Sequence, residues 1–230
     1  LYKDTEGEHR TMEELLEAVK ETHTDKDGNV VLLYTPDPEA QHSYVSAARG
    51  AGYTVIHLES PLASHLIQKL EMAGGDTKVQ FRRVDADIID RLIPKDDAPE
   101  SALTEEQQTA LKEEIEGIVP DKMVYKVAFA PMSPTAPPVT ITQSEFMRRM
   151  KEQQRVGGGG GMAMFGNMPD SYDMVFNANH PLVTSWTEGE AEDRKPKVQR
   201  AIALARLSQG LLQGEELTHF ISSGYADLND

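Results

Sequence analysis

The sequence predicts an α/β chain of two domains: a small three-layer αβα domain over residues 1–93 and an α+β domain over residues 94–230. Three observations indicate this division. Apolar runs of strand length alternate with amphipathic runs of helix length up to about residue 93. The stretch 94–106 is acidic, interrupted by proline and poor in apolar residues, as a domain boundary is. The chain then closes with two helical segments rich in apolar residues.

The first domain is expected to contain a helix from Thr11, because Thr11 and Glu14 have the spacing of a capping box ahead of an apolar stripe. Strands are expected over 30–35, 53–58 and 78–84, and helices over 38–49 and 61–72. Strands that alternate with helices imply a small parallel sheet covered on both faces, with right-handed crossovers.

In the second domain, Thr104 is expected to cap a helix through residue 119. Strands are expected over 121–132, 139–141 and 173–177, and the last should pair with 124–130. The tail is predicted to form two helices, one from Pro196 to Gly214 and one from Leu217 onward. Because their apolar surface exceeds what a small sheet can cover, we expect a second copy to complete a four-helix bundle across a dimer. The alternative is that both helices close over their own sheet.

The segment 140–168 links a helix to a glycine-rich stretch. Thr142 and Glu145 again have capping-box spacing. Five glycines at 157–161 are expected to end the helix, since each costs about 1 kcal/mol relative to alanine in a helix interior. The apolar side chains on one side of the helix are Phe146, Met147 and Met150, and those beyond the glycines are Met162, Met164, Phe165 and Met168.

Methionine is flexible and polarisable, so this segment resembles surfaces that adapt to varied apolar partners. Leaving a large apolar side chain in water forgoes roughly 1.5–3 kcal/mol, so exposure would indicate binding. The alternative is that the stripe is buried core.

Composition excludes several classes of protein. A formal net charge of −15 argues against DNA, RNA or anionic lipid as partners. No run of 18 apolar residues could span a membrane, and no signal peptide opens the chain. The absence of cysteine excludes disulfides, thiol nucleophiles and cysteine-based zinc sites, which suits a cytoplasmic protein. Because the chain starts at Leu1, it is expected to be a piece of a longer protein.

No catalytic or metal-ligating pattern with convincing spacing is present. Pro36–Glu39 after the first predicted strand would repel phosphate, and the 157–161 glycines lack the lysine and hydroxyl of a phosphate-binding loop. His57 and His65 flank Glu59, which leaves an α/β enzyme built on that loop as an alternative. We expect ordinary loop histidines there, and neither catalytic residues nor a bound metal.

Two blocks, ITQSEFMRRM at 141–150 and NANHPLV at 177–183, resemble bacterial members of the heat-shock-protein-90 chaperone family. The resemblance continues through 30–58 and through FRRVDADIIDRLI at 81–93, so it covers the whole chain. It implies that residues 1–93 are the last α/β part of the family's middle domain. Residues 94–230 would then be the C-terminal dimerisation domain.

The resemblance also implies roles. The helix with Phe146, Met147 and Met150 would hold partly unfolded client proteins, and we infer that Met162, Met164 and Phe165 extend this surface. The residues expected to pair with a second subunit are Ala201, Ile202, Ala205, Leu212, Leu217, Phe220 and Ile221.

The family's ATP-binding domain and catalytic arginine loop are expected upstream. This segment should therefore need no cofactor and hydrolyse no ATP, whereas the full-length protein should use ATP and Mg. No C-terminal peptide that recruits cochaperones is expected. The main alternative is a homodimerisation module with no direct client contact.

Overall fold

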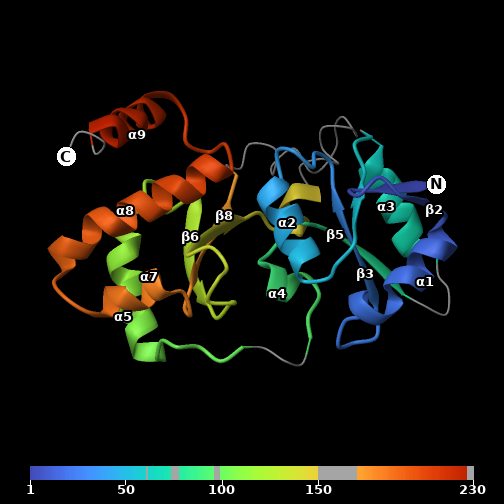
Figure 1. Cartoon of the computed structure of the whole chain (residues 1–230), viewed down its shortest axis with the longest axis horizontal. Helices are drawn as coiled ribbons and strands as arrows, with labels where there is room; N and C mark the ends of the chain where they lie inside the picture. The colour runs from blue at the N-terminus through green and yellow to red at the C-terminus, as the bar shows by residue number, and fades with distance from the viewer. Residues whose placement is uncertain (61, 74–77, 96–98, 150–169, 227–230) are drawn as a thin grey trace, which may run out of the picture. The chain divides into compact units, whose positions relative to one another are not determined.

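A computed structural model of the chain describes residues 1–60, 62–73, 78–95, 99–149 and 170–226. Its contacts divide the chain into two compact units (Figure 1). Unit 1 combines Leu1–Ala98 with Thr142–Tyr172, and unit 2 combines Pro99–Ile141 with Asp173–Asp230. Unit 1 is therefore discontinuous in sequence, because the chain returns to it after part of unit 2 has formed.

Unit 1 contains a five-stranded sheet of order β2-β1-β4-β3-β5. Its strands are β1 (Tyr2–Asp4), β2 (His9–Arg10), β3 (Val30–Thr35), β4 (Val55–His57) and β5 (Val79–Arg83). β3 pairs in parallel with both β4 and β5, as the sequence predicts. β1 and β2 form an additional antiparallel hairpin that was not predicted from the sequence, because its short polar strands lack an apolar pattern.

Helices cover both faces of this sheet (Figure 1), which confirms the three-layer prediction. They are α1 (Met12–His23) and α3 (Ala63–Met72) on one face, and α2 (His42–Gly50) and α4 (Ile89–Leu92) on the other. Successive side chains of a strand point to opposite faces. Leu32 of β3 accordingly packs in a core with Leu15 and Ile67, whereas Leu33 packs in a second core with Val45 and Leu92.

Helix starts follow local capping chemistry. The predicted box at Thr11 and Glu14 is present at the start of α1. α2 begins later than predicted, because the Asp37 carboxylate accepts hydrogen bonds from the N–H groups of Glu39 and Ala40 and forms a turn there.

Unit 2 contains a three-stranded sheet of order β6-β8-β7. Its elements are α5 (Glu105–Glu116), β6 (Tyr125–Ala130), β7 (Val139–Thr142), β8 (Tyr172–Asn177), α7 (Pro181–Thr184), the 3-10 helix η1 (Ser185–Thr187), α8 (Ala191–Ser208) and α9 (Gly214–Ala226). β8 lies beside β6, as predicted. Trp186 is 1% exposed, and its ring packs against Phe176 of β8 at 6.0 Å between centroids.

Three boundary predictions are wrong. Thr142 does not cap a helix: it is the buried last residue of β7, and the next helix begins at Glu145. α8 starts before Pro196 and contains it. Gly214 begins α9 and does not end α8; α8 ends near Gly210, whose φ of 64° is a conformation that glycine adopts readily.

His23 is buried between the layers of unit 1. This buried histidine should make the stability of unit 1 depend on pH. Its Nδ1 lies 2.7 Å from the Val31 carbonyl oxygen, and its Nε2 accepts a hydrogen bond from the Thr54 N–H at 3.0 Å. This arrangement requires a neutral ring with the proton on Nδ1. Burial lowers the pKa of His23 below its usual value.

We predict that the free energy of unfolding falls as the pH drops below about 6.5, where the unfolded chain binds a proton that the folded ring does not. Chemical denaturation at pH 8 and pH 5.5 measures this effect. His23→Gln should reduce the difference between the two values, whereas His9→Gln on the exposed β2 strand should leave it unchanged. An unaltered difference in the His23 variant would contradict the assignment.

Candidate functional site

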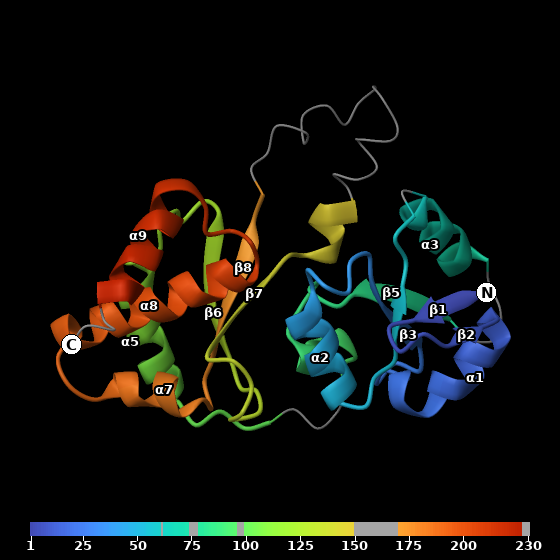
Figure 2. The same ribbon diagram turned by 45° about the horizontal axis from the view of Figure 1, so that its top comes forward.

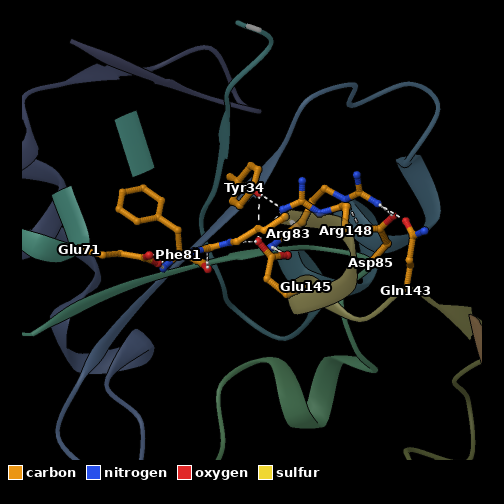
Figure 3. A network of polar contacts seen from close by, with 9 residues as sticks. Tyr34, Glu71, Phe81, Arg83, Asp85, Gln143, Glu145 and Arg148 are labelled. Atoms are coloured by element: carbon orange, nitrogen blue, oxygen red, sulfur yellow. Dashed lines mark hydrogen bonds and ion pairs between the residues drawn. The ribbon is translucent and has the colours of Figure 1, made fainter. Parts of the chain in front are cut away.

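Residues 145–149 are helical and lie against the edge of β5 in unit 1 (Figure 3). Arg149 makes the connection. Its guanidinium donates to the Glu71 carboxylate of α3 at 2.7 Å, to the Phe81 carbonyl oxygen of β5 at 2.6 Å and to the Glu145 carboxylate at 2.6 Å. One side chain therefore joins the 145–149 helix to α3 and β5.

β5 is the last strand of its sheet, so one side of its backbone faces no other strand in the described part of the chain. Side chains occupy that side. The Phe81 N–H donates to Glu71 Oε1 at 2.8 Å, and the Arg83 N–H donates to Glu145 Oε2 at 3.3 Å. Carboxylates therefore satisfy edge amides that would otherwise be open to pairing with another chain.

Glu145 lies in a cluster of polar groups (Figure 3). Its Oε1 accepts a hydrogen bond from the Tyr34 hydroxyl at 3.2 Å and is bonded by Arg148 and Arg149. Burial alone would raise the pKa of Glu145, but the two guanidinium groups outweigh burial and hold the pKa below its usual value. Arg148 is 7% exposed and also donates to the Tyr34 hydroxyl. The carboxylate is therefore ionised at neutral pH and compensates a buried positive charge.

An apolar groove adjoins this cluster and has a volume of about 1030 Å³. It is lined by apolar side chains of α1, α3, β5 and the 145–149 helix: Met12, Leu16, Leu70, Val79, Phe81 and Phe146. Glu71, Glu145 and Arg149 also line it, so the ion pairs border an apolar surface. The groove is large enough for several side chains of a bound polypeptide.

The structure describes part of the predicted client surface. Phe146 is 70% exposed and lines the groove, and Met147 is half-buried. The remaining residues of that prediction, Met150, Met162, Met164 and Phe165, lie outside the described residues. The residues predicted from the sequence did not include Met12, Leu16, Leu70 and Val79. The available signal was in α1, where Met12 and Leu16 lie beside the core stripe of Leu15 and Val19.

The predicted dimer residues fall into two groups. Ala201, Ile202, Ala205 and Leu212 are buried within unit 2 itself. Leu217 and Phe220 are half-buried, and Ile221 is 47% exposed.

α8 and α9 lie side by side (Figure 2), and side chains of the two helices contact each other. The Arg206–Glu216 ion pair closes at 2.6 Å, and the Arg200 guanidinium lies 5.0 Å from the centre of the Phe220 ring. α9 has no buried residue, and Leu204 and Leu207 of α8 are exposed. Apolar surface therefore remains free on both helices.

In the described residues of the histidine loop, the two histidines do not converge on a common site. His57 Nε2 lies 3.3 Å from the Pro36 carbonyl oxygen and 3.7 Å from a Glu59 oxygen, and His65 is exposed on α3. Among the described residues, no group of three or more histidine or acidic side chains could hold a metal ion. None of the helices in the described ranges is long and apolar enough to cross a membrane.

Comparison with known proteins identifies relatives along most of the chain. It is 36% identical over 200 residues to the chaperone protein HtpG of Bacteroides thetaiotaomicron, covering 86% of this chain and 29% of that protein. It is 38% identical over 189 residues to HtpG of Bacteroides fragilis, covering 80% of this chain and 27% of the relative. It is 35% identical over 221 residues to HtpG of Porphyromonas gingivalis, covering 94% of this chain and 32% of that protein. No family model matches the chain. The chain thus spans about a third or less of the length of these relatives.

The Glu145 cluster predicts a large cost for removing its charge. Glu145→Gln should lower the free energy of unfolding of unit 1 by about 3 kcal/mol, because it removes a negative charge that compensates the buried Arg148 guanidinium. Urea denaturation at pH 7.5 measures the loss. The matched control is Glu13→Gln, on the exposed side of α1, which should change stability by less than about 0.5 kcal/mol.

The difference between the Glu145 variant and the parent chain should also shrink in acid. Since folding depresses the pKa of Glu145, its contribution is present above the pKa of the unfolded chain and disappears as pH falls through the folded value. A difference that stayed constant down to pH 3 would contradict this account.

Proposed function

The chain belongs to the HtpG family of chaperones and corresponds to a segment of those proteins, and we propose that this segment dimerises and holds partly unfolded client proteins. In the whole protein, ATP bound by domains outside this segment would drive the cycle of client capture and release. We place the protein in the cytoplasm. The proposed arrangement is the last α/β part of a middle domain followed by a C-terminal dimerisation domain.

The exposure of Phe146 beside the apolar groove is the observation that carries the client proposal. An exposed phenylalanine forgoes roughly 1.5–3 kcal/mol of burial, and here it lines a groove with other partly exposed apolar side chains. A bound apolar segment would recover that free energy. The alternative in which the whole stripe is sealed in the core is wrong for Phe146.

The composition of the groove suits varied sequences. Met12, Leu16 and Leu70 are unbranched or flexible enough to repack around different side chains. The net charge of −15 would favour neutral or basic client segments over acidic ones.

A second copy is the proposed partner of α8 and α9. Both helices keep exposed apolar side chains after packing in their own unit, namely Leu204, Leu207 and Ile221. Two copies of this helical pair would bury these side chains in a four-helix bundle. In this arrangement, the residues that join α8 to α9 within one copy differ from those that join the two copies.

Substituting Phe146 tests the client surface. Phe146→Ser should raise the concentration of chain needed to suppress aggregation of a heat-unfolded model protein by about five- to tenfold, because each 1.4 kcal/mol of lost binding is tenfold in affinity. Met123→Ser, at a 79% exposed position of unit 2, is the matched control and should have no effect. Equal suppression by the Phe146 variant and the parent chain would refute the proposal.

Charge substitutions on the terminal helices test the dimer. Light scattering should give a dimer mass for the parent chain at micromolar concentration, and a monomer mass for Leu204→Glu and for Ile221→Glu. Both positions are exposed in one subunit, so the thermal unfolding of unit 2 should change little. Leu182→Glu on α7 is the control and should remain dimeric. A monomeric parent chain would contradict the proposed bundle.

A further inference from the structure

We propose that Arg149 and Glu71 are positioning residues for the client site, and that their ion pair fixes the 145–149 helix on β5 so that Phe146 faces the groove. This inference rests on the client-holding function proposed above. It adds the means by which the site is kept in place and a dependence of client affinity on ionic strength.

Polar contacts, rather than apolar burial, hold the described part of this helix. Phe146 is mostly exposed, and Met147 and Arg149 are half-buried. Arg148 alone is buried among residues 145–149, and it is charged. The segment is therefore attached to unit 1 mainly through its three charged side chains.

The Arg149 guanidinium bonds to several acceptors at once. Its Nη1 and Nη2 reach the two oxygens of Glu71 at 2.7 and 3.1 Å, while Nη2 also reaches the Phe81 carbonyl oxygen and Nε reaches Glu145. One planar guanidinium group therefore donates hydrogen bonds to acceptors on α3, on β5 and on the 145–149 helix itself. A lysine ammonium lacks this fork and cannot reproduce the arrangement.

Hydrogen bonds to the backbone of β5 fix the position of the helix along that strand. Outward amides occur at every second residue of an edge strand. Glu71 accepts from the amide of Phe81, and Glu145 accepts from the amide of Arg83, the next outward one. Because both carboxylates are bonded by Arg149, the helix is held at one position along β5. Phe146 follows Glu145 directly, so its place beside the groove is set by the same bonds.

The Glu71–Arg149 ion pair should make the position of the helix sensitive to salt. The Glu71 and Arg149 side chains are 23% and 26% exposed, so dissolved ions can screen their attraction. Salt does not weaken apolar contacts in this way. A client site that consisted of apolar surface alone would keep its affinity in salt, whereas one positioned by this ion pair would lose affinity.

The experiment measures binding of a fluorescently labelled, permanently unfolded apolar polypeptide to the full chain at 50 and 500 mM NaCl. We expect the parent chain to bind about threefold or more weakly at the higher salt. Glu71→Gln and Arg149→Met should each weaken binding about three- to tenfold at 50 mM NaCl and abolish most of the salt dependence. Since both remove the same pair, the double variant should bind no more weakly than the worse single variant.

Two further variants complete the design. Arg149→Lys should recover only part of the affinity, because it restores the charge without the fork. Arg194→Met is the matched control: Arg194 forms a similar half-buried pair with Glu114 at 2.9 Å in unit 2 and also donates to backbone oxygens. It should leave polypeptide binding and its salt dependence unchanged.

Amide hydrogen exchange gives a second readout at single residues. Exchange at the outward Phe81 N–H should accelerate in Glu71→Gln and in Arg149→Met, while the amides that pair β3 with β5 stay protected, so that release of the helix is distinguished from unfolding.

Two results would overturn the inference: affinity unaltered by either variant, or additive losses in the double variant. If Phe146→Ser weakens binding while these variants do not, the positioning role fails alone. If Phe146→Ser also has no effect, the client function itself fails.

Discussion

The edge of β5 imposes the constraint on which unit 1 depends. Backbone amides on the open side of an edge strand need partners, and in this chain carboxylates from α3 and from residue 145 supply them. The Glu145 carboxylate lies 62 residues along the chain from Arg83, whose N–H donates a hydrogen bond to it. Completing the sheet therefore requires the chain to return to unit 1 after forming α5 and two strands of unit 2, which explains why unit 1 is discontinuous in sequence.

Local patterns predicted the parts of the fold that local chemistry determines. The continuous apolar run of β3 identified a strand buried on both faces, and Thr11 with Glu14 identified the start of α1. The same reasoning failed at Glu145, which has the spacing of a capping residue. Its carboxylate instead accepts hydrogen bonds from the Tyr34 hydroxyl and the Arg83 backbone N–H, and it pairs with the guanidinium groups of Arg148 and Arg149. Tertiary partners of a charged side chain have no signature in the sequence around it, so the ion-pair cluster could not be predicted.

The terminal helices show a related limit. Their apolar residues were visible in the sequence, yet the pattern did not divide them between the unit's own core and a surface. Ala201, Ile202 and Ala205 belong to the core, whereas Leu204 and Leu207 remain exposed on the same helix. A helix with apolar residues on more than one side can contribute both to the core and to an exposed apolar surface. Only the packing within its own unit shows which residues do each.

The burial of Trp186 has a spectroscopic consequence. It is the single tryptophan in the chain and lies in the core of unit 2, against Phe176. Intrinsic fluorescence excited at the red edge of protein absorption will therefore report on unit 2 alone, while unit 1 contributes no indole emission. Comparing that signal with far-ultraviolet circular dichroism, which both units generate, separates the cooperative melting of one unit from that of the other without any label.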